Sequence, residues 1–372
     1  MKHWKNFDWL LIGIPILLVA FGTIMLYAIS LWAPNVPYST PFKQAAYLIL
    51  GLLAFWFMTS LDYKILRALV WPAYVIVLLG LIYVYVKGHS SLGATRWIDL
   101  GFIQIQPSEP AKLIVVVALA RFLSDRANRM GEISTVLGSL VIVGIPALLV
   151  LRQPDFGTAM VLGAIWFAAM IMASTPLVYM AGVVLTFAIV TPIAWTKVLK
   201  RFQRNRLLSF LHPNQYLSSF NWNPYHAAIA IGSGGPWGEW FSRGTESRLN
   251  FLINQNTDFI FSVIAEQIGF VGLLILFAAY GILFMRIARV AFMAADLFGR
   301  LLASGVLAMF LFQTFVNVGM NMGIMPVTGI PLPLLSYGGS SLITSLAALG
   351  ILESILLRHQ KLVFNAGAPA MA

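Results

Sequence analysis

The longest uncharged stretch of the chain, residues 156–196, reads FGTAMVLGAIWFAAMIMASTPLVYMAGVVLTFAIVTPIAWT. A helix needs about 20 apolar residues to cross the hydrocarbon core of a bilayer, so this stretch is long enough for two crossings. A Ser-Thr-Pro sequence at 174–176 interrupts it near the middle, and proline seldom continues a helix. The stretch therefore predicts two membrane-spanning helices, at 156–174 and 176–196, joined by a short turn.

The composition of the whole chain supports this interpretation. Of its 372 residues, 59% are hydrophobic and only 10% are charged, against roughly 25% charged in a soluble domain, and the mean hydropathy is +0.84. These values exclude a soluble enzyme, a disordered chain and a nucleic-acid-binding domain, despite the net charge of +11. The absence of cysteine excludes disulfides, thiolate metal sites and cysteine nucleophiles.

Other charge-poor segments extend the pattern along the chain. We expect an all-α integral membrane protein that forms one polytopic domain over residues 1–372, with a large extracytoplasmic loop at 197–257 between the seventh and eighth spans. The predicted spans are 9–32, 44–61, 68–86, 108–122, 133–151, 156–174, 176–196, 259–285, 301–325 and 341–357.

The distribution of basic residues predicts the orientation. With the N-terminus inside, the inner tails and loops hold twelve Lys and Arg residues and the short outer loops hold four. Basic residues collect on the cytoplasmic side of membrane spans, so we expect both termini in the cytoplasm. The excess of positive charge then indicates contact with anionic membrane lipid rather than with nucleic acid.

Asp258 is the acidic residue with the clearest alternative interpretations. It lies in the sequence Asn-Thr-Asp-Phe-Ile-Phe at 256–261, where the eighth span is predicted to begin. It could cap the helix N-terminus, since Asn, Thr and Asp all satisfy free amides there. It could also be a carboxylate at the outer membrane boundary, kept ionised by the helix and able to accept a proton. Its position alone favours neither.

Three acids fall within predicted spans: Glu109, Glu266 and Glu353, the last near the inner end of the tenth span. Glu109 and Lys112 are three residues apart and share a helix face. They could form an ion pair that lets both enter the membrane, or Glu109 could hold Lys112 toward an anionic ligand. Glu266 follows Asp258 by eight residues, roughly 12 Å deeper at about 1.5 Å per residue, so we expect it to make a structural polar contact.

The outer segments contain further candidates. Trp97 follows Arg96, and it could be a membrane-interface tryptophan or could stack on a sugar. Five basic residues in 197–206 could touch lipid headgroups or attract a phosphate-bearing lipid. The glycine-rich sequence at 231–235 follows a helical pattern and therefore indicates a helix C-terminus rather than a phosphate-binding loop.

The last outer segment has an irregular sequence. Residues 331–340 read PLPLLSYGGS and cannot form a regular helix. Irregular backbone at membrane depth is tolerated where protein or a watery cavity surrounds it, so we expect this segment to line a cavity, with Ser336 and Tyr337 as candidates for substrate contacts. The five histidines include no metal-like pair; we expect His212 and His226 in loops, and no residues are assigned to a metal.

Seven stretches run in the same order as in a known family: TRWI at 95–98, QPSE at 106–109 with Lys112, QPDFGT at 153–158, AIGSGG at 230–235, TDFIF at 257–261, PVTGIPLP at 326–333 and SYGGS at 336–340. Together they resemble the SEDS family of bacterial cell-wall polymerases over nearly the whole chain. The PVTGIP sequence is similar to the RodA branch, because the FtsW branch tends to carry Lys there. The chain departs from the family at 253–256, where INQN replaces the usual Pro, acid and His before Thr-Asp.

The resemblance implies a function. It implies a peptidoglycan glycosyltransferase that polymerises lipid II into β-1,4 glycan strands on the outer face of the bacterial cytoplasmic membrane during lateral elongation. Its partners would be the nascent glycan strand, a class B penicillin-binding protein that acts as transpeptidase, and other elongation-complex membrane proteins. The family's catalytic aspartate corresponds to Asp258, and its functionally sensitive tryptophan, glutamate and lysine correspond to Trp97, Glu109 and Lys112.

The expected chemistry fits these residues. Conversion of an α-linked diphosphate to a β-1,4 bond is one inversion, which indicates a single displacement with Asp258 as base. The undecaprenyl diphosphate leaving group needs positive charge rather than a proton. The candidates for that charge are Lys112, Arg96, Arg152, Arg243 and a divalent cation (Mg²⁺ or Mn²⁺).

Two alternatives stay open on the sequence. Ten spans with intramembrane Glu and Lys would also suit a transporter, including a lipid II flippase. The chain could instead be a non-catalytic scaffold for the partner transpeptidase. The polar and motif-rich segments crowd the outer side, which favours surface chemistry.

Overall fold

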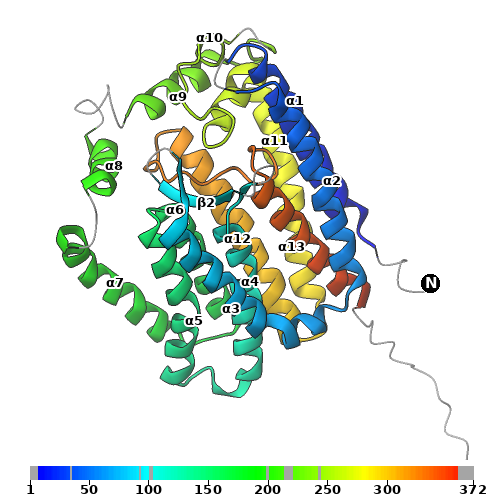
Figure 1. The fold of residues 1–372 in the computed structure, drawn as a ribbon. Helices are drawn as coiled ribbons and strands as arrows, with labels where there is room; N and C mark the ends of the chain where they lie inside the picture. The colour runs from blue at the N-terminus through cyan, green and yellow to red at the C-terminus, as the bar shows by residue number, and fades with distance from the viewer. Residues whose placement is uncertain are drawn as a thin grey trace, which may run out of the picture.

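Long helices form a bundle, and two of the shorter helices, α9 (Trp222–Ser233) and α10 (Thr245–Arg248), lie at one end of it (Figure 1). The computed structural model describes residues 7–33, 36–91, 94–99, 104–197, 201–212, 221–241 and 244–358. The long helices are α1 (Trp9–Ser30), α2 (Ser39–Ser60), α3 (Tyr63–Lys87), α4 (Ser108–Asp125), α5 (Ile133–Arg152), α6 (Phe156–Met172), α7 (Leu177–Lys197), α11 (Ile260–Met293), α12 (Leu297–Asn321) and α13 (Gly339–Arg358). The shorter ones are α8 (Arg201–Leu211), α9 (Trp222–Ser233), α10 (Thr245–Arg248) and the 3₁₀ turn η2 (Ala127–Arg129).

Each predicted span overlaps one long helix, with ends that differ by up to eight residues. Within the described residues, seven of these helices are long and apolar enough to cross a membrane, and the apolar parts of α6 and α7 are shorter. The predicted break at 174–176 lies between α6 and α7. The count of ten crossings and the side on which each loop lies stay predictions.

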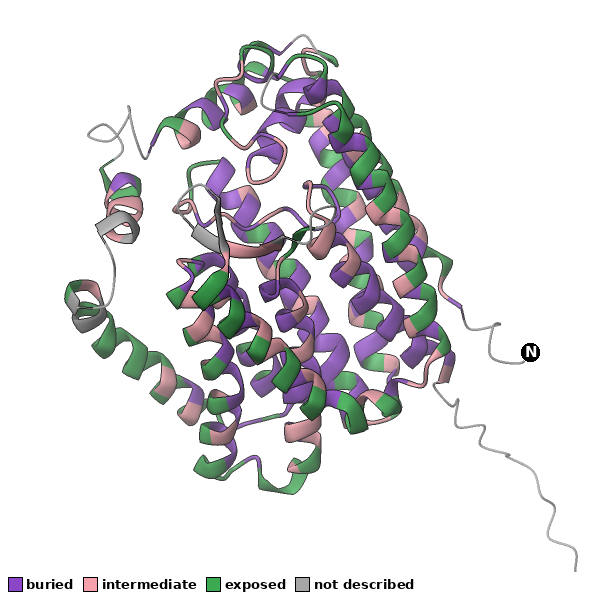
Figure 2. Ribbon diagram, in the orientation of Figure 1, coloured by how far each residue is buried: buried purple, intermediate pink, exposed green. Residues whose placement is uncertain are grey.

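The pattern of burial fits helices that face lipid. Most of α12 and α13 is buried inside the bundle, whereas α2, α3 and α7 carry many exposed residues (Figure 2). Large apolar side chains are exposed along these outer helices, among them Leu53, Ile76 and Phe187. An apolar exterior of this extent marks a surface that contacts membrane.

A short antiparallel sheet corrects the all-α prediction. It consists of β1 (His89–Ser91), β2 (Ala94–Asp99) and β3 (Gln104–Ile105), in that order. The strands are two to six residues long, too short for hydropathy alone to indicate. The fold is therefore mainly helical, with one small sheet beside the bundle that carries Arg96 and Trp97 on β2.

A second correction concerns the eighth span, predicted as a continuous helix at 259–285. α11 is broken at Gly269, where φ is 65° and ψ is −170°, a conformation nearly confined to glycine. The segment 235–240 fills the break and pairs with the backbone groups that the break releases. These bonds are Phe270 N to Gly235 O (2.9 Å), Val271 N to Pro236 O (3.1 Å), Glu239 N to Glu266 O (2.9 Å) and Trp240 N to Gln267 O (3.0 Å).

At the break, the backbones of α11 and of the segment 235–240 lie so close together that neither Gly269 nor Gly238 could carry a side chain. A Cβ atom on Gly269 would lie 2.2 Å from Gly238 N, and one on Gly238 would lie 2.2 Å from Gln267 O. Gly281, later in the same helix, has no heavy atom within 4 Å of its Cβ position. The packing at the break therefore requires glycine at position 269, whereas position 281 has space for a side chain.

We expect Gly269→Ala to lower the stability of the protein by at least about 1–3 kcal/mol, because it combines a forbidden conformation with a backbone clash. Gly281→Ala is the matched control and should change stability by less than about 1 kcal/mol. Thermal unfolding of the two purified variants in detergent measures the difference. Equal unfolding temperatures would show that the break tolerates a side chain.

Candidate active site

Asp258 lies in a turn just before α11. The helix begins at Ile260, its N-cap is Phe259, and no side chain caps it. The interpretation of Asp258 as a helix cap is therefore wrong. Within the described residues the carboxylate accepts no hydrogen bond, and the residue is only partly exposed. With respect to the described residues, its two oxygens are therefore available for a proton or a ligand.

The backbone of Asp258 is held by two asparagines at the end of α12. Asn317 Nδ2 donates to Asp258 O (3.0 Å) and to Ile330 O (2.8 Å). Asn321 Nδ2 also donates to Asp258 O (2.9 Å). Both asparagines have no exposed surface. Buried hydrogen bonds of this kind are costly to leave unmade, so the pair fixes the turn that carries the carboxylate.

The irregular segment 326–338 braces the same turn from another side. Ser336 Oγ donates to Thr257 O (2.6 Å) and accepts from Leu332 N (2.8 Å). Tyr337 N donates to Asn256 O (2.9 Å). The segment is not helical, as predicted. These bonds place Ser336 and Tyr337 directly against the Asp258 turn, while a contact of either with substrate stays a prediction.

Two arginines and a second aspartate act electrostatically on Asp258. Burial raises the pKa of Asp258 to about 6; Arg96 and Arg206 lower it, and Asp155 raises it. Near neutral pH most of the carboxylate is therefore ionised, yet it binds a proton more readily than an ordinary aspartate, whose pKa is about 3.9. These are the properties of a general base.

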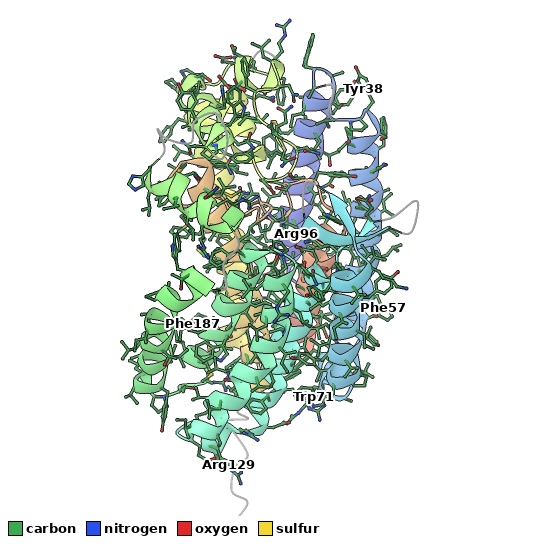
Figure 3. The ribbon with its side chains drawn as sticks, turned by 60° about the vertical axis from the view of Figure 1, so that its left-hand side comes forward. Tyr38, Phe57, Trp71, Arg96, Arg129 and Phe187 are labelled. Atoms are coloured by element: carbon green, nitrogen blue, oxygen red, sulfur yellow. The ribbon has the colours of Figure 1, made fainter. Side chains whose placement is uncertain are left out.

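Arg96 reaches the site from β2. Its Nη1 lies 3.8 Å from Asp155 Oδ1, its Nε donates to Gln153 O (3.4 Å), and Nη2 donates to Pro154 O. Figure 3 shows Arg96 between the end of the molecule marked by Tyr38 and the end marked by Arg129. The small sheet thus anchors a guanidinium group on the turn between α5 and α6.

Arg206, on α8, was not predicted as a site residue. Burial lowers the pKa of the Arg206 guanidinium and Arg96 lowers it further, while Asp258 and Asp155 raise it. Arginine nevertheless stays protonated in proteins. The basic run 197–206 was the signal that could have identified it: the run was expected to touch lipid headgroups or to attract a phosphate-bearing lipid, and no single residue of it was assigned to the site.

The QPDFGT sequence at 153–158 packs closely against the segment 326–338, which braces the Asp258 turn. Asp155 is 2% exposed and caps α6 by accepting from Thr158 N (3.1 Å) and Thr158 Oγ1 (2.9 Å). A Cβ atom on Gly157 would lie 2.5 Å from Ile330 Cγ1 and 2.9 Å from Thr328 O. Glycine therefore lets the start of α6 contact the segment that braces Asp258. Three of the quoted motifs converge here.

Glu109 and Lys112 form a buried ion pair inside α4. Lys112 Nζ lies 2.9 Å from Glu109 Oε1, and the residues are 2% and 4% exposed. Neither is among the groups that shift the pKa of Asp258. The geometry corresponds to the structural interpretation of the pair, and a direct role in substrate binding stays a prediction.

The other predicted site residues are dispersed. Trp97 is partly buried on β2. Arg152 is exposed at the last position of α5, and Arg243 lies outside the described residues. Of the predicted cations that the structure describes, only Arg96 acts electrostatically on Asp258.

Three expectations concern the 197–257 segment and the start of the helix that follows it. Glu266 accepts from Glu246 N (2.8 Å) and Ser247 N (3.1 Å) of α10, which confirms a structural contact. α9 ends at Ser233, which confirms the glycine-rich sequence as a helix end. His226 lies in the 197–257 connection, as expected, where it is part of α9, with Nδ1 2.7 Å from Glu246 Oε2.

The described residues do not build a metal site. They contain no group of three or more His, Asp or Glu side chains placed to hold an ion. Asp155, the other acid that acts on Asp258, uses both carboxylate oxygens to cap α6. Among the described residues, the groups around Asp258 therefore supply one base and two guanidinium groups, and not the ligand set of a resident divalent cation.

Comparisons with known proteins agree with this arrangement. The FTSW_RODA_SPOVE family of cell cycle proteins matches residues 8–361. The chain is 35% identical over 348 residues to "Peptidoglycan glycosyltransferase MrdB" of Escherichia coli strain K12, covering 93% of this chain and 94% of that protein.

Two solved structures share the fold. One is a chain of a peptidoglycan synthase complex, described for its structural coordination of polymerization and crosslinking. It has a TM-score of 0.81 at 32% identity and covers 94% of this chain and 97% of that one. The other is the crystal structure of the Thermus thermophilus rod shape determining protein RodA. Its TM-score is 0.71 at 31% identity, over 96% of this chain and 99% of that one.

The ion pair in α4 allows a direct test of its role. We expect Lys112→Met to lower stability by about 3–5 kcal/mol, because it leaves Glu109 charged and buried without a partner. The double variant Glu109→Gln, Lys112→Met should recover most of that loss, as measured by thermal unfolding in detergent. If the double variant is as unstable as the single one, the pair is not the source of the stability.

Proposed function

The chain belongs to the FtsW, RodA and SpoVE family, and we propose from this membership and from the site that it is a peptidoglycan glycosyltransferase that polymerises lipid II. The observation that carries the proposal is the Asp258 carboxylate, which is held by its backbone, accepts no hydrogen bond from the described residues, and is acted on by two arginines. The PVTGIP sequence at 326–331 supports the RodA branch and hence a role in lateral elongation.

The reaction is a single displacement with inversion. The 4-hydroxyl oxygen of the acceptor sugar attacks C1 of the donor sugar and forms the β-1,4 bond, while its proton passes to an oxygen of Asp258. The bond between C1 and the diphosphate oxygen breaks, and the electron pair leaves with undecaprenyl diphosphate. Glycosidases use two carboxyl groups, but a diphosphate departs as a stable anion, so one base is enough.

The two arginines act on both the base and the leaving group. Arg96 and Arg206 lower the pKa of Asp258 and so keep it ionised before attack. The same guanidinium groups can stabilise the negative charge that develops on the departing diphosphate. Binding of the substrate is therefore electrostatic: the two guanidinium groups attract the diphosphate and so bring the sugar next to the Asp258 carboxylate.

A divalent cation, Mg²⁺ or Mn²⁺, would have to come with the substrate. The described protein groups offer it only the Asp258 carboxylate, so we assign no step to it. We also propose that the site faces the outer side of the cytoplasmic membrane, with both termini in the cytoplasm. A class B penicillin-binding protein is the proposed partner, supported by the similarity to a chain of a peptidoglycan synthase complex.

Substitution of the base is the main test. We expect Asp258→Asn to reduce polymerisation of purified lipid II by at least about 100-fold, the range of general-base catalysis. Glu132→Gln is the matched control, because Glu132 is an exposed acid outside the site, and it should keep wild-type activity. Glycan strands are measured by gel electrophoresis, with and without the partner transpeptidase and with a chelator.

The outcomes of this experiment separate the alternatives. Retained polymerisation by Asp258→Asn would contradict the assignment of the base. Movement of lipid II across liposomes without polymer would favour a flippase. Dependence of polymerisation on the partner alone, with no effect of Asp258→Asn, would favour a scaffold.

The pH dependence gives a second test. The base must be deprotonated, so the rate should fall as the pH drops through about 6, the pKa of Asp258. Arg96→Gln removes a charge that lowers this pKa, so the acidic limb of the profile should move to higher pH. A profile measured on both proteins that shows no such displacement would contradict the electrostatic coupling.

A further inference from the structure

The two parts of α11 lie side by side rather than end to end. The ring centres of Phe261 and Phe277 are 5.9 Å apart, whereas the same stretch of straight helix would separate the two residues by about 24 Å. The chain therefore folds back at Gly269, and the segment 235–240 fills the tip of the resulting hairpin. Asp258 lies farther from this tip than Glu266 does, which reverses the order of depth expected for a continuous span.

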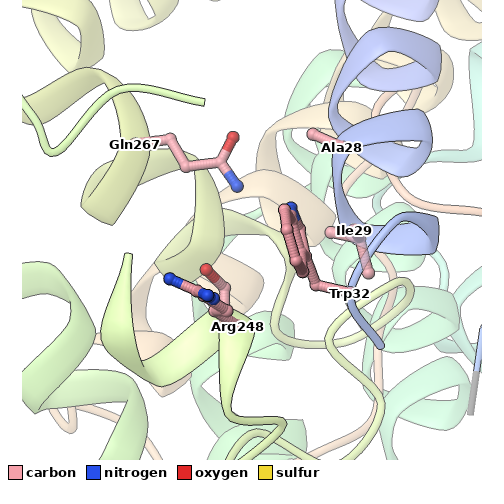
Figure 4. Close-up of a pocket in the computed structure, with 6 residues that line it drawn as sticks. Ala28, Ile29, Trp32, Arg248 and Gln267 are labelled. Carbon is pink, nitrogen blue, oxygen red and sulfur yellow. The ribbon is translucent and has the colours of Figure 1, made fainter. Parts of the chain in front are cut away.

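The tip of the hairpin lies level with the end of α1. Gln267, just before the break, lines the same small hollow as Ala28 and Trp32 (Figure 4). α1 is apolar enough to cross a membrane and ends at Ser30. Tyr27 and Trp32, beside that end, are exposed, and such aromatic residues gather where the hydrocarbon core meets the headgroups. The tip therefore lies at the depth of the boundary between membrane and water.

Large aromatic side chains project from the tip. Trp237 is 71% exposed and Trp240 is 67% exposed. Within the described residues, neither indole group has a hydrogen-bond or ring partner. The backbone of Trp240 has a φ of 62°, which is unfavourable for an aromatic residue, and its N donates to Gln267 O (3.0 Å). The backbone of the tip thus holds this indole away from the rest of the protein.

The exposed tip continues the apolar outer side of α11. Val271 N donates to Pro236 O (3.1 Å), so Trp237 follows a residue bonded to the second part of the helix. Phe270, Leu274 and Ile275 on that part are exposed, and α11 contains a stretch apolar enough to cross a membrane. The surface that faces acyl chains therefore extends up to the two indole groups, which combine an apolar ring with one N–H donor.

We propose that Trp237 and Trp240 anchor the hairpin at the surface of the phospholipid bilayer. Their rings lie among the upper parts of the acyl chains, and their N–H groups donate to ester or phosphate oxygens of the lipid. Lipid is the occupant because the indoles lie at the depth of Trp32 and border the apolar side of α11. The anchor sets the depth of the tip and hence of the helical part that leads back to Asp258. It is independent of the proposed catalytic activity.

Tryptophan fluorescence of the full-length protein in phospholipid nanodiscs tests the proposal. The difference in emission between the wild type and the double variant Trp237→Phe, Trp240→Phe reports these two indoles among the 11 tryptophans of the chain. Bromine on the upper part of the acyl chains should quench this emission severalfold more strongly than bromine at the chain ends. Aqueous iodide should leave it largely unquenched.

Trp166→Phe is the matched control. Trp166 is buried in the bundle and donates to Ser139 Oγ (2.9 Å), so the emission that this substitution removes should be less sensitive to bromine at either position. Circular dichroism and size-exclusion chromatography of each variant establish that the fold is kept.

Other results would overturn the assignment. Quenching of the two indoles by iodide and not by bromine would show that the tip is exposed to water. Protection from iodide that appears only when a partner protein is added would make the tip a protein docking surface. Equal quenching by bromine at both positions on the acyl chain would contradict a place at the membrane surface.

Discussion

The backbone carbonyl of Asp258, held between the side-chain amides of Asn317 and Asn321, is the constraint on which the site depends. Strong hydrogen bonds to the oxygens of a carboxylate lower its pKa and so weaken it as a base. Here the chain is fixed one step away, at the peptide group, by two donors with no exposed surface. The side chain therefore keeps its position without losing its capacity to act as a base.

Hydrogen bonds from other parts of the protein also stabilise the irregular backbone around this turn. Ser336 bridges Thr257 O and Leu332 N, and the segment 235–240 pairs with the groups released at Gly269. Where polar backbone cannot reach water, protein must satisfy it. Glycine at 157 and 269 permits the close approaches that this pairing requires. Most residues of the quoted motifs thus serve to pack irregular segments against one another and to pair their backbone groups.

The long helices could be predicted from the sequence because hydropathy is a property of each segment alone. The break at Gly269 could not, because it depends on pairing with a segment about 30 residues earlier. The strands of the small sheet are too short to show a period. Asp258 was identified by its position and by resemblance. Arg206 was missed as a site residue because its proximity to Arg96 and Asp155 arises only from tertiary structure.

The central claim is that the surroundings of Asp258 make it a base poised near neutral pH. Difference infrared spectroscopy of the wild type against Asp258→Asn, recorded as the pH is varied, measures the protonation of this carboxyl directly. The account predicts a carboxylic acid band that is present in the wild type, absent in the variant, and lost as the pH rises through about 6. A carboxyl that ionises near pH 3.9, as an unperturbed aspartate does, or a band that persists in the variant, would contradict it.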